Sequence, residues 1–154
     1  MLDIYDEFLR LVESLDERKI DYALCGGMAL AVHGSPRATI DIDLLILSES
    51  LEEIILLAAA RGYTIRGKDL SFAGGAIEIR RISKIDRESG DLLSLDLLLV
   101  TPEIQEVWAT RISTEWEGRL LSIVSREGLI ALKKLRGSGQ DLDDIVKLQN
   151  GSSI

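Results

Sequence analysis

The sequence predicts an α/β (α+β) fold, with helices flanking a mixed, mostly antiparallel sheet. Its 154 residues have the length of one domain, and helical and strand-like segments alternate along them. Residues 76–83 alternate apolar and polar side chains, and residues 92–100 return as a strand after a turn at 86–90, which is typical of an antiparallel hairpin. We expect a single domain over residues 1–150 and a frayed tail at 151–154.

The N-terminal third contains the first predicted elements. Residues 3–19 carry apolar side chains at helical spacing, with acidic residues near the start, and predict a helix that covers the sheet. A short strand at 21–25 and a short helix at 28–33 follow. Residues 50–61 form another predicted helix, which begins with a capping-box pattern at Ser50.

The C-terminal third predicts further helices and one short strand. Residues 101–110 form a helix with proline in its first turn, and residues 120–124 form a strand. Ser125 caps an amphipathic helix that ends at Gly137, and a final helix is expected over residues 141–148.

One predicted strand, residues 40–47, is apolar at every position except Asp41 and Asp43. Because strand side chains alternate between faces and the rise is about 3.3 Å per residue, the two carboxylates project from one face, roughly 6–7 Å apart. Ile42 points the other way, into the core. Neighbouring carboxylates repel each other, so a divalent metal ion is their natural partner.

A third carboxylate, Asp96, interrupts the apolar strand at residues 92–100. If adjacent strands bring it beside Asp41 and Asp43, the three carboxylates could hold two Mg²⁺ ions, about 3.5–4 Å apart, suited to phosphoryl transfer. The alternatives are that Asp96 lies on an exposed strand face, or pairs with an arginine such as Arg80 across the hairpin. A structural Ca²⁺ site is less favoured, because the acids are spread over strands rather than gathered in a loop.

A glycine pair, Gly26 and Gly27, stands where a strand passes into a helix. Glycine lets a phosphate approach the backbone, and the N–H groups at a helix start bind it. Many strand-to-helix turns contain glycine without binding anything, so the pair gains weight from preceding the acidic strand. His33 ends the same helix, and we interpret it as a surface or capping residue rather than a general base.

These motifs together resemble the nucleotidyltransferase superfamily, which is related to the DNA polymerase β palm, and in particular its minimal, AbiEii-like toxin-type branch. The residues that carry the resemblance are Gly26 and Gly27, the segment Pro36 to Thr39, Asp41 and Asp43, and Asp96. It covers about residues 20–148 and implies the nucleotidyltransferase fold. It also implies that the glycine pair holds a nucleoside triphosphate and that the three acids bind two Mg²⁺ ions.

The resemblance assigns further roles residue by residue. Asp96 would also activate the acceptor hydroxyl. Separately from the resemblance, Arg37 and Thr39 precede the acidic strand and could help position phosphate or metal, although turn residues need no function to be there. In the AbiEii-like branch a helix lysine approaches the triphosphate, and Lys133 or Lys134 matches it; a solvated helix face is the alternative for both.

An Arg-Asp-x-x-Asp segment follows that lysine in the AbiEii-like branch. Asp141 and Asp144 match its acids, whereas Gln140 stands where arginine is common. The glycine pair likewise replaces the Gly-Ser of many catalytic members.

The implied activity is transfer of a nucleoside monophosphate from a triphosphate, with ATP as the expected donor, to an acceptor hydroxyl on RNA, protein or a small molecule. A toxin–antitoxin role is consistent with it, as is a partner protein or a second copy that completes the site. The rival hypothesis is a non-catalytic module that keeps the fold to bind nucleotide or a partner. Gln140 and the Gly26-Gly27 variant of the glycine motif favour the rival, and three retained carboxylates argue against it.

Composition excludes other classes of protein. A net charge of −8 argues against a protein that coats nucleic acid. No apolar run approaches the roughly 18–20 residues of a membrane helix, and the one cysteine, Cys25, is expected to be buried and inert, so we expect a cytoplasmic protein. Residues 61–87 hold seven basic and three acidic residues, which predicts either a solvated surface or a contact surface for an anionic acceptor.

Overall fold

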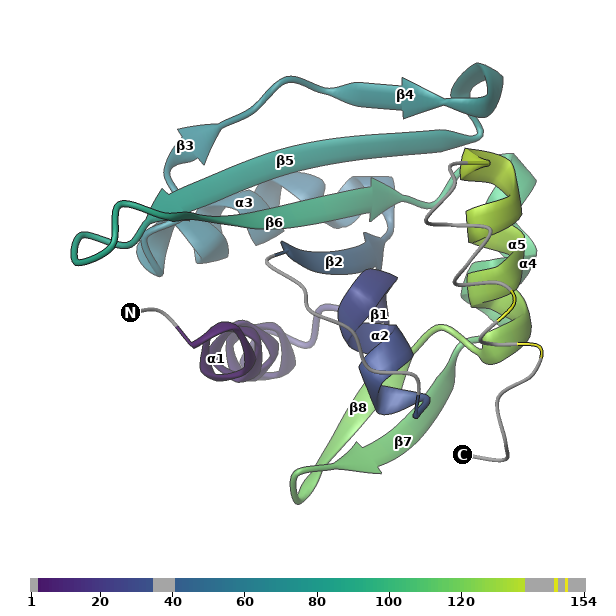
Figure 1. Cartoon of the computed structure of the whole chain (residues 1–154), viewed down its shortest axis with the longest axis horizontal. Helices are drawn as coiled ribbons and strands as arrows, with labels where there is room; N and C mark the ends of the chain where they lie inside the picture. The colour runs from purple at the N-terminus through teal and green to yellow at the C-terminus, as the bar shows by residue number, and fades with distance from the viewer. Residues whose placement is uncertain (1–2, 35–40, 138–145, 147–148, 150–154) are drawn as a thin grey trace.

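One mixed sheet runs through the computed structural model, which describes residues 3–34, 41–137, 146 and 149 (Figure 1). Its strands are β1 (Ala23–Cys25), β2 (Asp41–Ile46), β3 (Ile65–Arg66), β4 (Leu70–Phe72), β5 (Ile77–Ile85), β6 (Leu92–Leu99), β7 (Ile112–Trp116) and β8 (Arg119–Ile123). They lie in the order β3-β5-β6-β2-β1-β8-β7, with β4 also paired to β5. β2 pairs with β6 and β1 with β8 in parallel, and the other described pairs are antiparallel. This confirms the predicted fold class.

Helices flank this sheet. They are α1 (Ile4–Glu17), α2 (Gly26–Val32), α3 (Leu51–Ala60), α4 (Gln105–Ala109) and α5 (Arg126–Arg136), with 3₁₀ turns η1 (Ser48–Ser50), η2 (Ala73–Gly75) and η3 (Pro102–Ile104). α1 and α3 pack against each other, and α4 and α5 lie side by side at the end to which β6 points (Figure 1). None of the described helices is long and apolar enough to cross a membrane.

Capping residues set the ends of the two amphipathic helices. Asp3 accepts hydrogen bonds from the backbone N–H groups of Tyr5 and Asp6 and so begins α1. Ser125 accepts from the N–H of Gly128 and begins α5, as predicted. Gly137, at φ +69°, ends α5 in the left-handed conformation that favours glycine.

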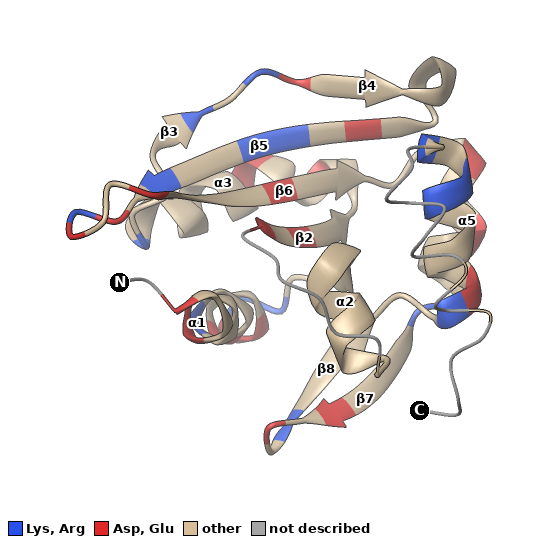
Figure 2. Ribbon diagram, viewed as in Figure 1, with Lys and Arg blue, Asp and Glu red and all other residues tan. Residues whose placement is uncertain are grey.

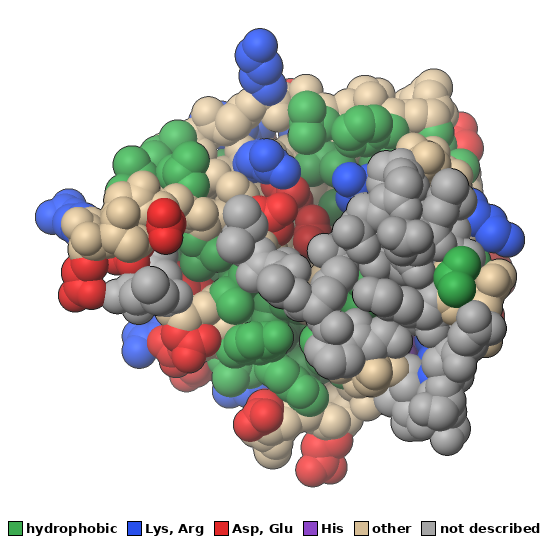
Figure 3. Space-filling view, viewed as in Figure 1, with side chains coloured by type: hydrophobic (Ala, Val, Ile, Leu, Met, Phe, Trp, Pro, Cys, Tyr) green, Lys and Arg blue, Asp and Glu red, His purple; other side chains and the backbone are tan. Residues whose placement is uncertain are grey.

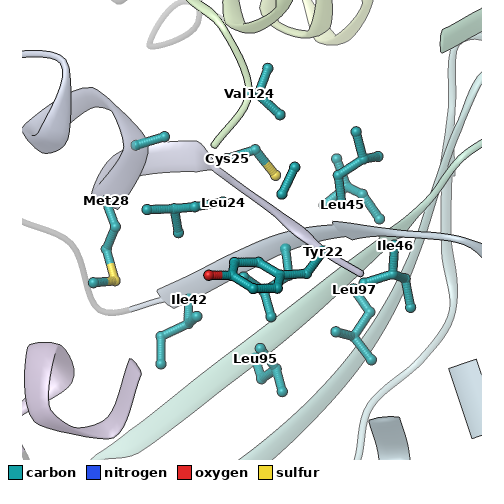
Figure 4. Close-up of a cluster of buried hydrophobic side chains, with 14 of the residues drawn as sticks. Tyr22, Leu24, Cys25, Met28, Ile42, Leu45, Ile46, Leu95, Leu97 and Val124 are labelled. Carbon is teal, nitrogen blue, oxygen red and sulfur yellow. The ribbon is translucent and has the colours of Figure 1, made fainter. Parts of the chain in front are cut away.

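The core lies where β1, β2 and β6 meet (Figure 4). Ile42, Leu45 and Ile46 of β2 are fully buried, as are Leu95 and Leu97 of β6. Full burial of such a side chain stabilises the fold by about 1.5–3 kcal/mol. These central strands are therefore rigid supports for any polar side chain that they carry.

A partly buried polar network fixes α1 to the sheet. Lys84 of β5 lies 2.6 Å from Glu7 of α1, and the hydroxyl of Tyr63 donates to the same carboxylate at 2.9 Å. The Lys84 ammonium also donates to the carbonyl of Arg61. This network occupies the face of β5 opposite to the one that carries Arg81, because successive strand residues alternate.

Local structure differs from expectation near two helices. Ser50 makes no side-chain cap to α3, because the turn η1 leads directly into the helix and gives Ser50 helical backbone angles (φ −89°, ψ −8°). The predicted capping box is therefore wrong. The glycine pair lies inside the first turn of α2, which begins at Gly26 and not at residue 28.

The sequence predicts only the second strand of the hairpin β7–β8, at residues 120–124; the first strand, β7, carries no clear signal. Its two-residue loop, Glu117-Gly118, has positive φ at both positions (53° and 75°). Such loops usually contain Asn-Gly or Asp-Gly, so Glu117 gave no turn signal.

Candidate active site

A row of polar side chains crosses four strands at one register. Cys25 of β1 is the Cα partner of Asp43, Asp43 of Asp96, and Asp96 of Arg81 in β5. Cross-strand partners share a face of the sheet, so these side chains lie on the same face. We call it the acidic face. In Figure 2 the acidic segments of β2 and β6 lie beside the basic segment of β5.

A second polar row runs parallel to the first, two residues earlier on β2. Asp41 pairs with Ser94, and Ser94 with Ser83. The two serine hydroxyls are buried and lie 3.0 Å apart. Asp41 and Asp43 thus project from the face opposite to the fully buried Ile42, as the alternation predicted.

Asp43 is buried among other ionisable groups of the acidic face. Burial, with the neighbouring carboxylates of Asp96 and Asp41, raises its pKa to about 7. Arg136 and Lys133 oppose this rise. Burial also raises the pKa of the Cys25 thiol well above its ordinary value, which fits the inert thiol that we expected.

Gly26 touches the Asp43 side chain. A Cβ at Gly26 would lie 2.6 Å from Asp43 Cγ, closer than any real contact, and the residue has φ +69°. Glycine is therefore required here for space as well as for backbone conformation. The contact places the start of α2 directly against the acidic face.

Asp96 is held by Arg81 in a two-pronged ion pair. Arg81 Nε donates to one carboxylate oxygen at 2.6 Å and Nη2 to the other at 2.8 Å. The alternative that Asp96 pairs with an arginine across the hairpin is therefore confirmed, although this arginine is Arg81 and not Arg80. Arg80 is opposite Leu97 in the register and points to the other face, where it pairs with Asp69 and Glu78.

α5 brings positive charge to Asp43. Lys133 is only 4% exposed, and it lines a small cavity of about 20 Å³ together with Cys25, Gly26, Asp43 and Arg136. Of the two lysines that matched the family motif, Lys133 is thus the one beside the acids, while Lys134 is exposed. Sequence reasoning missed Arg136, although its position three residues after Lys133 puts both on one helix face.

The donor set suits a hard cation. Asp41, Asp43 and Asp96 supply carboxylate oxygens from one face of the sheet, and carboxylate oxygens are ligands that such a cation prefers. Among the described residues, no three His, Cys, Asp or Glu side chains are close enough to one another to enclose a metal ion.

Several predicted site residues lie outside the described part of the chain. They are Arg37, Thr39, Gln140, Asp141 and Asp144. His33 is the C-cap residue of α2, which confirms the predicted capping position, but it is buried and does not lie on the surface. It is 8% exposed, and its Nε2 lies 2.9 Å from the carbonyl oxygen of Val124, because the end of α2 packs against the residue that follows β8.

The basic region at residues 61–87 is largely paired within the chain. Arg66 and Arg80 contact Asp69, Arg81 contacts Asp96, and Lys84 contacts Glu7. Figure 3 shows acidic and basic side chains close together on this side of the molecule.

Comparison with a family model identifies the chain. The model described as nucleotidyl transferase AbiEii toxin, type IV TA system, matches residues 8–133. The chain belongs to this family. It is therefore a nucleotidyltransferase, and the matched range includes the glycine pair, the three aspartates and Lys133.

Solved structures share the fold of this AbiEii-family nucleotidyltransferase. The lincosamide antibiotic adenylyltransferase LnuA, with lincomycin bound, is 19% identical, with a TM-score of 0.61 over 96% of this chain and 97% of its own. ANT(2″)-Ia, in complex with adenylyl-2″-tobramycin, is 15% identical, with a TM-score of 0.61 over 93% and 86%. JHP933 from Helicobacter pylori is 18% identical, with a TM-score of 0.53 over 94% and 63%. No curated protein matches the chain.

Proposed function

We propose that this AbiEii-family enzyme moves a nucleoside monophosphate from a nucleoside triphosphate, with ATP as the expected donor, to an acceptor hydroxyl. One observation carries the proposal. Asp43 and Asp96 are direct neighbours on parallel strands, with Lys133 of α5 beside Asp43. Carboxylates and a buried ammonium at one point suit a triphosphate with its divalent cations.

The acids have distinct roles in this proposal. Asp41, Asp43 and Asp96 would hold divalent cations, expected to be two Mg²⁺ ions, whose charge would neutralise the phosphates and stabilise the transition state. Asp96 also accepts the proton of the acceptor hydroxyl at a carboxylate oxygen. The acceptor oxygen then forms a bond to the α-phosphorus, the bond from that phosphorus to the β-phosphate bridge breaks, and pyrophosphate leaves.

Other residues bind and orient the triphosphate. Lys133 contacts its phosphates, since it is the buried cation beside Asp43. Gly26 and Gly27 let phosphate approach the first N–H groups of α2, which has no side-chain cap. Arg37 and Thr39, which precede the acidic strand, are proposed to assist.

The acceptor is an RNA, a protein or a small molecule. The family description supports a toxin of a toxin–antitoxin system, with a cognate protein or a second copy as partner. The bound lincomycin and adenylyl-tobramycin of the structural neighbours support a small-molecule hydroxyl as a further option. The reaction would take place in the cytoplasm.

A labelling experiment tests the proposal. Purified protein is incubated with Mg²⁺ and each α-³²P-labelled nucleoside triphosphate in turn, with cell extract, purified RNA, or lincomycin and tobramycin as acceptors. We expect label on one class of acceptor, strongest with ATP. The variant Asp41→Asn/Asp43→Asn should transfer none.

The opposite result would favour the non-catalytic rival. If folded protein labels no acceptor with any nucleotide, even after addition of a co-expressed partner, the enzymatic role of this chain is refuted. Nucleotide binding by the same protein, measured by calorimetry, would then support the binding module.

A further inference from the structure

Arg81 is the residue of the acidic face that the family resemblance leaves unassigned. Its guanidinium engages both oxygens of Asp96, the carboxylate proposed to bind cation and to accept the proton. The Asp96 side chain is 6% exposed, whereas that of Arg81 is 38% exposed. The arginine therefore covers the buried acid from the solvent side.

The backbone around Arg81 holds it in this position. The N–H of Gly67 donates to the Arg81 carbonyl at 2.9 Å. A Cβ at Gly67 would lie 3.3 Å from Arg81 Cβ and Cγ, so the segment between β3 and β4 packs tightly on the stem of the arginine. Packing thus fixes the stem of Arg81, whereas the guanidinium is held by its hydrogen bonds to Asp96.

We propose that Arg81 is a latch on Asp96, which holds this carboxylate away from divalent cations until a triphosphate offers the guanidinium another anion. The inference rests on the proposed function, because it takes Asp96 as a cation ligand. In the closed state Arg81 neutralises Asp96. In the open state it pairs with the phosphates of the nucleotide.

Arg81 can exchange one partner for the other because a carboxylate and a phosphate offer a guanidinium similar hydrogen bonds. A guanidinium fork matches a carboxylate and a phosphate in the same two-pronged geometry. In the register, Arg81 is opposite Asp96 and Asp96 is opposite Asp43, so the arginine lies on the same face of the sheet as these acids. Bound nucleotide then raises the affinity for the cation, and bound cation raises the affinity for the nucleotide by the same factor.

Two affinities of the variant Arg81→Gln test the latch: the affinity for Mn²⁺ should rise, and the affinity for nucleotide should fall. We expect nucleotide-free Arg81→Gln to bind Mn²⁺ roughly tenfold more tightly than the wild type, since one charge-assisted pair no longer competes. Mn²⁺ binding is followed by electron paramagnetic resonance. In EDTA, the same variant should bind α,β-methylene-ATP several-fold more weakly. A purely structural role would weaken both.

Matched variants separate the possible results. Arg80→Gln, on the opposite face of the same strand, should leave both affinities unchanged, and Asp43→Asn should abolish Mn²⁺ binding. If Mn²⁺ binding depends on Asp43 but is not tightened in Arg81→Gln, the latch is refuted and the proposed function stands. Unchanged nucleotide affinity refutes the exchange onto phosphate. Absence of Asp43-dependent Mn²⁺ binding in every variant refutes the metal site and the latch together.

Discussion

Asp43 has charges of both signs around it. Asp96 and Asp41 are its acidic neighbours, and Lys133 and Arg136 approach it from α5. Without a cation, burial and the two acids outweigh the two bases, and the pKa of Asp43 is raised to about 7. The side chain that suits the proposed chemistry therefore destabilises the metal-free fold once it is ionised.

The free energy of unfolding should fall as pH rises and Asp43 becomes ionised. The folded pKa of Asp43, about 7, is above the ordinary aspartate pKa of 3.8, so its contribution to stability is fully present below about pH 4 and is lost as pH rises through 7. In EDTA, the free energy of unfolding of the wild type minus that of Asp43→Asn should fall across this window, by about 1.4 kcal/mol for each unit of raised pKa. Urea unfolding at several pH values measures this difference.

The control for this prediction is Mg²⁺ at pH 8. A cation that binds only the folded state should raise the stability of the wild type and leave Asp43→Asn unchanged. A difference between the two proteins that stays flat from pH 4 to pH 7 would contradict the strain on Asp43.

At the scale of elements, the junction between β1 and α2 positions the site. The last residue of β1, Cys25, is opposite Asp43 in the register. The next residue, Gly26, begins α2 directly against the Asp43 carboxylate. α5 closes the other side with Lys133. The site is thus built from a strand-to-helix turn, a strand pair and one helix face.

Gly26→Ala tests this junction. Strain at positive φ costs about 1–2 kcal/mol, and the collision with Asp43 adds roughly 1–3 kcal/mol. Urea unfolding should therefore show a loss of about 2–5 kcal/mol. Gly118→Ala is the matched control, because Gly118 has φ +75° and nothing within 4 Å of its added Cβ. Equal losses in the two variants would contradict the close approach of Gly26 to Asp43.

At the scale of the whole molecule, the distribution of charge disfavours a large contact surface for RNA. The net charge is −8, and most cations of residues 61–87 pair with acids of the same chain. Lys68 and Arg87 are exposed residues of this region, on the β3–β4 segment and in the β5–β6 turn. An RNA acceptor that docks here would use few phosphate contacts.

The variant Lys68→Gln/Arg87→Gln tests docking of an RNA acceptor on this region. We expect a several-fold higher KM for RNA, and a slope of log affinity against log salt that is smaller by roughly 0.7 for each lost phosphate contact on a single strand. Arg10→Gln, on α1, is the control and should change neither. If RNA labelling proceeds with unaltered KM in Lys68→Gln/Arg87→Gln, this region is not the acceptor surface.

Local patterns in the sequence were enough to predict the fold class and to single out the three aspartates. The alternation around Asp41 and Asp43 predicted a common face, and an isolated carboxylate in an apolar strand marked Asp96. These signals are local, because strand periodicity and the cost of burying a charge act on each residue where it stands.

Only the tertiary structure decided which partners the acids have. The sequence allowed an arginine opposite Asp96, but register decides between Arg80 and Arg81, and a shift of one residue moves every side chain to the other face. The burial of His33 against Val124, and the approach of Lys133 and Arg136 to Asp43, likewise depend on packing between distant segments. The sequence determined which residues are chemically unusual, and packing and register determined what each of them meets.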